Sequence, residues 1–314
     1  MSSPQEHNHR LREIMKSIDP RSVMESHYQH LPEYQSPVLN IQNGFRVTKA
    51  SSEPHVDSRV YLCGGSTVFC AEVADHETLP SHLQLFFNSH KVRAQVENWG
   101  RMGATLENRV WYLLQRERPK PGELVIFLFG ANDSGYRELN HNRGVNRSCF
   151  RVTLFQILGY YKKRPSRRTP KVIRAIRMGI LVYVLSPLVA EFTVRRTLRI
   201  LRSYCQLTEQ RGGRAIAVLQ PSLLDWHRRF GGRDIRLARN MPLEAMDRRA
   251  YRRYRQIIRA QKGEGWLVDG SKYLDRATHC YLDWIHVNST GNSLLAERIG
   301  LMLIERRLLP VRRT

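Results

Sequence analysis

A serine, a histidine and an aspartate, each in a distinctive local setting, are the residues of this chain best suited to nucleophilic chemistry. Ser66 follows two glycines in the block CGGST, so its backbone can turn tightly and its hydroxyl can be exposed. Asp283 and His286 form a DxxH block just before an expected helix. A carboxylate beside an imidazole can hold its tautomer and stabilise the imidazolium. These three residues together predict a serine activated by a base.

Two further positions suit the binding of a developing oxyanion. Asn132, in the block GAND, can donate a side-chain N–H, and Gly103, in NWGRMGAT, lets a backbone N–H approach a ligand closely. Each feature also has an ordinary structural explanation, as a turn, a helix cap or a surface histidine. Only the order and placement of all the blocks together therefore predict a site.

The elements expected around these blocks alternate between strands and helices. Apolar runs predict strands over 60–63, 92–96, 124–129, 215–219 and 266–268, and helical spacing predicts helices over 105–117, 194–210, 243–261 and 290–307. Such alternation predicts an α/β fold, a three-layer α/β/α sandwich with a central parallel sheet of about five strands. Ser66, Gly103 and Asn132 each follow a strand, and ligands bind at the carboxyl ends of strands in such folds.

In this order, the blocks around Ser66, Gly103, Asn132 and His286 resemble those of the SGNH hydrolase superfamily, the GDSL-like lipases and esterases. The first block departs from Gly-Asp-Ser and is similar to a GGST-type variant. The segment NIQNGFR at 40–46 and the LQP at 219–221 are also similar to segments of that branch. The resemblance covers roughly 58–135 and 195–306, and implies a flavodoxin-like fold.

The resemblance also implies a serine-dependent hydrolase that cleaves a carboxylic ester through an acyl-serine intermediate, with an O-acetyl group on a carbohydrate as one candidate substrate. Ser66 would be the nucleophile, His286 the general base and then acid, and Asp283 its orienting partner. Backbone N–H groups of Ser66 and Gly103 and the Asn132 amide would form the oxyanion hole. No cofactor or metal is implied. Two alternatives stay open: an O-acyltransferase with the same triad, and a non-catalytic module that binds an anionic glycan or membrane surface.

The charge of the chain is unusual for an enzyme of 314 residues, with a formal net charge of +23. Between residues 137 and 202 there are sixteen Arg and Lys residues against two acidic ones. We expect a lead-in segment over 1–57 and a hydrolase domain over 58–314, with a basic, partly apolar insertion at 136–193. The insertion predicts a substrate lid, a contact with an anionic membrane surface through 160–202, or a helical cap. Nucleic acid is not expected as a partner, and the oligomeric state is left open.

Cysteine usage and the N-terminal residues indicate a reducing compartment. The five cysteines are odd in number and form no CxxC pair, which argues against a disulfide framework or a zinc site. The first 20 residues lack the apolar run of a secretory signal. The apolar stretch at 178–190 is interrupted by Pro187 and is shorter than the roughly 20 residues of a spanning helix. We expect a cytoplasmic protein, peripheral to a membrane if the basic insertion binds one.

Overall fold

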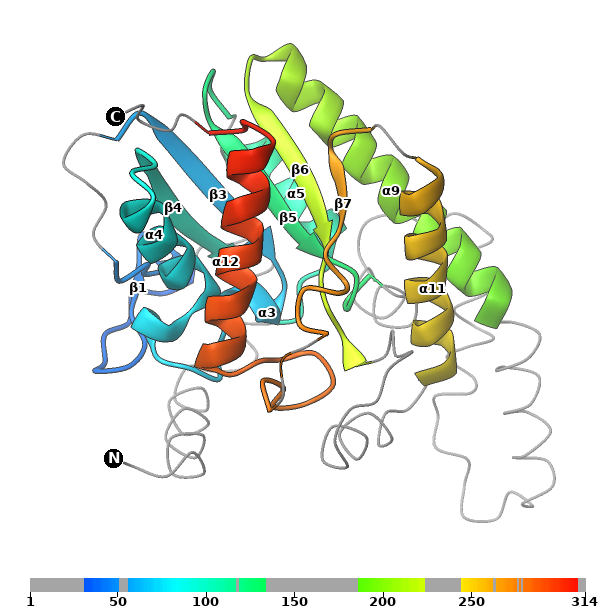
Figure 1. Ribbon diagram of the computed structural model, residues 1–314, viewed down its shortest axis with the longest axis horizontal. Helices are drawn as coiled ribbons and strands as arrows, with labels where there is room; N and C mark the ends of the chain where they lie inside the picture. The colour runs from blue at the N-terminus through cyan, green and yellow to red at the C-terminus, as the bar shows by residue number, and fades with distance from the viewer. Residues whose placement is uncertain are drawn as a thin grey trace.

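A seven-stranded sheet forms the centre of the computed structural model, which describes residues 31–50, 56–116, 119–133, 186–223, 244–261, 264–275, 277 and 279–309 (Figure 1). The strand order is β1-β2-β4-β3-β5-β6-β7. Their bounds are β1 Ile41–Gln42, β2 Phe45–Arg46, β3 Ser58–Gly64, β4 Ala94–Gly100, β5 Leu124–Phe129, β6 Arg214–Leu219 and β7 Leu267–Asp269. The five neighbouring strands β4, β3, β5, β6 and β7 pair in parallel, which confirms the predicted parallel sheet.

Helices cover both faces of this sheet. The described helices are α3 Ser66–Phe69, α4 Leu79–Ser89, α5 Leu106–Arg116, α9 Ser186–Gln210, α11 Glu244–Ala260 and α12 Ser289–Glu305, with a 3-10 turn, η2, at Asp75–Glu77. The even-numbered residues of β5 pack in one core with α4 and α12, and its odd-numbered residues pack in a second core with α5, α9 and α11. Because β5 is buried on both faces, it reads as the uninterrupted apolar run LVIFLF. The three-layer sandwich is confirmed.

Helix α4 is the largest element that the sequence patterns above do not predict. Its first turn is set by Thr78, whose hydroxyl accepts the backbone N–H of Ser81 and caps the helix. Leu79, Leu83 and Phe87 recur every four residues and are fully buried. They pack in the core that α4 shares with α12, so the helical signal is present in the sequence.

The lead-in segment contributes two strands to the sheet. Asn43 and Gly44 have positive φ values of 52° and 79°, as the tight turn of a β-hairpin requires. This turn joins β1 to β2, and β2 then pairs antiparallel with β4 through Arg46 and Asn98. The strands predicted from apolar runs do not include 41–46. The Asn-Gly pair is the sequence signal for this hairpin.

Two other boundaries differ from those predicted. Strand β4 runs to Gly100 instead of ending at 96, because its polar residues pair in register with β3 over the full length of that strand. Helix α9 begins at Ser186 instead of 194, with Pro187 in its first turn, where proline is tolerated. The last eight residues of the predicted insertion thus belong to α9.

The rest of the predicted insertion, residues 136–185, lies outside the described residues, so its assignment as lid, membrane segment or cap stays a prediction. Within the described part, α9 exposes Leu188 and Phe192 one turn apart, followed by Arg195. Among the described helices, none combines the length and apolar character needed to cross a bilayer.

Candidate active site

Ser66, His286 and Asp283, which come from opposite ends of the chain, form one hydrogen-bonded series beyond the carboxyl end of β3. The Oγ of Ser66 lies 2.7 Å from Nε2 of His286, and Nδ1 of that ring lies 2.7 Å from Oδ2 of Asp283. The imidazole side chain is only 15% exposed. In this geometry the ring can take the hydroxyl proton at Nε2 while the carboxylate holds the N–H at Nδ1.

The position of Ser66 follows from the glycine before it. A side chain at Gly65 would place a Cβ atom 2.3 Å from Nδ2 of Asn132, so any other residue there would displace the amide. Without that side chain, the turn after β3 lies directly against the turn after β5. Ser66 begins the single helical turn α3 and is 7% exposed.

The loop that carries Asp283 and His286 is held by its own hydrogen bonds. Oδ1 of Asp283 accepts the backbone N–H groups of Ile285 and His286, both at 2.8 Å, which leaves Oδ2 for the imidazole. Burial would raise the pKa of Asp283, but the hydrogen bond and charge of His286 and these two N–H groups outweigh it, and the pKa is lowered. Trp284 and Ile285 pack on Ala131 and so join this loop to the Asn132 block.

The two predicted oxyanion donors other than Ser66 itself, Gly103 and Asn132, differ in how closely they approach that serine. Residues 64–67, Ala104 and residues 128–133 line a small pocket, which brings Asn132 beside the serine. The amide of Asn132 donates a 2.9 Å hydrogen bond to the carbonyl of Ala104, which fixes its orientation. Gly103 has a φ of 66° but is not among the lining residues. Its assignment as a donor stays a prediction.

Asp133 organises this pocket, although the sequence patterns did not point to it. Its carboxylate accepts the backbone N–H of Gly130 at 3.0 Å and that of Leu106 at 2.7 Å. The first bond closes the turn after β5, and the second caps the N-terminus of α5, where an anion is favoured. Burial raises the pKa of Asp133. Asp133 therefore links the turn after β5 to the start of α5.

The LQP segment has a direct contact with the serine block. Oγ1 of Thr67 donates a 2.8 Å hydrogen bond to Oε1 of Gln220, which follows β6. The backbone N–H of Leu223 then donates to the carbonyl of Trp284 at 3.0 Å. The turn after β6 thus supports both the serine turn and the loop that carries the histidine.

A glutamate that sequence reasoning missed also lies at this site. Oε1 of Glu72 is 3.6 Å from Nε2 of His286, on the side of the ring that faces Ser66. Burial raises the pKa of Glu72, while the charge of His286 acts in the opposite direction. A single acidic residue six positions after the serine gives no pattern by which the sequence could have revealed it.

No known protein-family profile matches this chain, and no curated protein matches it. Solved structures do match it: this chain is similar to structures of GDSL-type hydrolases. The lipase/acylhydrolase from Enterococcus faecalis is 14% identical, with 82% of this chain and 100% of that chain covered and a TM-score of 0.45. A lipolytic protein of the G-D-S-L family from Veillonella parvula is 10% identical, with 79% and 97% covered and a TM-score of 0.42.

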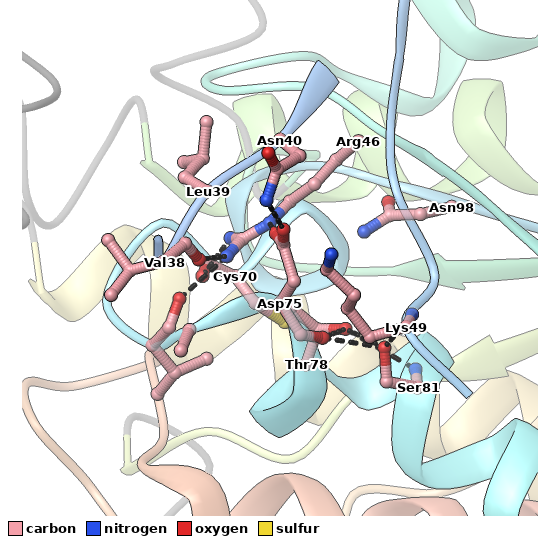
Figure 2. Close-up of polar contacts among 12 residues, drawn as sticks. Val38, Leu39, Asn40, Arg46, Lys49, Cys70, Asp75, Thr78, Ser81 and Asn98 are labelled. Atoms are coloured by element: carbon pink, nitrogen blue, oxygen red, sulfur yellow. Dashed lines mark hydrogen bonds and ion pairs between the residues drawn. The ribbon is translucent and has the colours of Figure 1, made fainter. Parts of the chain in front are cut away.

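A buried arginine from the lead-in hairpin supports the serine turn from behind. The guanidinium of Arg46 donates to Oδ1 of Asp75 at 2.8 Å and to the carbonyl of Cys70 at 2.5 Å (Figure 2). It also donates to the carbonyls of Phe69 and Val73, at 2.8 and 2.7 Å. The side chains of the ion pair are 0% and 2% exposed. Arg46 therefore satisfies the carbonyl groups at the end of α3, the helical turn that Ser66 begins.

Replacing Arg46 by methionine should lower the free energy of unfolding by about 3–5 kcal/mol, because Asp75 would remain as a buried charge without its cation. The matched control is Arg59→Met, which removes an arginine that is half exposed and 3.8 Å from Glu97. An exposed pair contributes about 0–1 kcal/mol. Urea unfolding followed by circular dichroism would measure both, and equal losses would contradict a special role for Arg46.

Proposed function

We propose that this protein is a serine-dependent hydrolase of the SGNH type that cleaves a carboxylic ester. The observation that carries the proposal is the hydrogen-bonded series of Ser66, His286 and Asp283, with 2.7 Å at each link. These links are short enough for direct proton transfer from the hydroxyl to the imidazole. Hydrogen-bond reach between Ser66 and His286 favours a catalytic site over a module that only binds.

The proposed reaction has two halves. The Oγ of Ser66 attacks the ester carbonyl as His286 takes the hydroxyl proton, and the oxyanion forms beside Asn132. The protonated imidazole then gives its proton to the leaving alcohol oxygen, and an acyl-serine remains. In the second half, His286 removes a proton from water, the hydroxide attacks the acyl group, and the proton returns to Ser66. Asp283 remains a carboxylate throughout and stabilises the imidazolium.

A short acyl group fits the proposal best. The pocket beside Ser66 is small, and Gly64, Gly65, Ala104 and Ala131 contribute to its lining. A pocket of this size has room for few carbon atoms next to the nucleophile. Removal of an acetyl group is the form of the reaction we favour, with a carbohydrate as the candidate carrier of the ester.

Labelling with a fluorophosphonate probe tests whether the serine is activated. We expect the wild-type protein to be labelled and Ser66→Ala to lose the label, because the probe reacts with a serine whose proton a base can remove. Ser203→Ala is the control, since Ser203 lies on the exposed side of α9 and should leave labelling unchanged. Equal labelling of Ser66→Ala and wild type would overturn the proposal.

A further inference from the structure

The imidazole of His286 has a carboxylate near each of its two nitrogens. Asp283 lies 2.7 Å from Nδ1, and Glu72 lies 3.6 Å from Nε2. The reaction proposed above gives a role to Asp283, Ser66 and the ring itself, and none to Glu72. The Glu72 side chain is 24% exposed, so a ligand in the site can reach it.

The backbone on either side of Glu72 is held by the same anchors as the serine turn. Glu72 follows α3 and Cys70, whose φ of 57° turns the chain out of the helix. Arg46 binds the carbonyls of Cys70 and Val73, the residues two before and one after Glu72. The segment that carries the carboxylate is therefore fixed by buried hydrogen bonds.

Glu72 lies near the place where the alcohol part of an ester must bind. To receive its proton, the leaving oxygen has to come within about 3 Å of Nε2. Oε1 of Glu72 is 3.6 Å from the same nitrogen. A hydroxyl on the second carbon from the ester oxygen can thus come within reach of this carboxylate. A carboxylate accepts hydrogen bonds and donates none, so it favours a hydroxyl there.

We infer that Glu72 is a specificity-determining residue that selects esters whose alcohol part carries a hydroxyl group on the carbon adjacent to the one that bears the ester oxygen, as in polyols and sugars. The inference rests on the proposed function and names the substrate class of that site. A hydrogen bond to a charged group is worth roughly 1.5–3 kcal/mol, which corresponds to about 10-fold or more in kcat/KM.

The test compares two esters of nearly the same shape, 2-hydroxyethyl acetate and propyl acetate, in which a hydroxyl replaces a methyl group. We expect the wild-type protein to prefer the hydroxyethyl ester by about 10-fold in kcat/KM. In Glu72→Met, which has no strong acceptor, that ratio should fall to about 1. Glu72→Gln, which retains a neutral acceptor, should give an intermediate ratio.

The ratio separates recognition from damage to the fold, because a distorted site lowers the rates of both esters together. Glu264→Met is the control: Glu264 precedes β7, at the far end of the sheet, and its replacement should leave the ratio unchanged. If hydrolysis depends on Ser66 but Glu72→Met shows the same ratio as wild type, the role of Glu72 is overturned and the proposed function is not. No Ser66-dependent hydrolysis of either ester overturns the proposed function, and this role with it.

Discussion

Replacing Ser66 by alanine should lower kcat for hydrolysis of a short-chain ester by about 10⁴- to 10⁶-fold, because the acyl-enzyme can no longer form. His286→Ala should cost about as much, since a neutral serine hydroxyl is a weak nucleophile without its base. The double variant should be hardly worse than either single one, because the hydroxyl and the imidazole act as a unit. Steady-state kinetics on p-nitrophenyl acetate would measure all three.

The control for this series is circular dichroism of each variant, which should show an unchanged thermal transition within a few degrees. Multiplicative losses, with the double variant much slower than either single one, would mean that the two side chains act independently. That outcome would contradict the 2.7 Å hydrogen bond between Ser66 and His286 as the basis of catalysis.

Asp283→Asn should lower kcat by about 10⁴-fold while the loop keeps its shape. In the asparagine variant the Oδ1 atom still accepts the N–H groups of Ile285 and His286, as it does now. The atom facing Nδ1 then becomes an NH₂ donor, so the ring has to carry its proton on Nε2. An imidazole protonated at Nε2 cannot accept the proton of Ser66.

Asp269→Asn is the matched control for that variant. Like Asp283, Asp269 accepts the backbone N–H of the residue two positions later, which is Ser271. It should keep full activity. A loss in Asp283→Asn of less than about 10-fold would argue against the role of Asp283 in fixing the tautomer.

The lowered pKa of Asp283 adds a pH prediction. Asp283 stays ionised at pH values at which an ordinary aspartate is already partly protonated. Loss of activity on acidification should therefore follow protonation of His286.

The sequence allowed prediction of the parts of the site that lie in short, separated blocks. Ser66, Asn132 and the Asp283–His286 pair stand at the ends of apolar runs or before an amphipathic helix, and strand-end placement in a parallel sheet predicts that they converge. The structure places His286 within hydrogen-bond distance of both Ser66 and Asp283.

Arg46 and Glu72 could not be identified in the same way, because their surroundings are made by residues far along the chain. Nothing near Arg46 in the sequence shows that its guanidinium will be buried against the carbonyls that end α3. An arginine on a short strand is ordinarily a surface residue. Similarly, the contact between Glu72 and His286 joins residues more than two hundred positions apart.

The lead-in hairpin has a consequence for where the catalytic unit begins. A chain that started at Ser58 would contain the whole parallel sheet and every residue that takes part in the proposed proton transfers. It would nevertheless lack the guanidinium that neutralises Asp75 and ties down the carbonyls behind the nucleophile. We therefore expect the smallest chain that folds with its serine turn intact to include the Asn-Gly hairpin, although the hairpin supplies no residue of the proposed proton transfers.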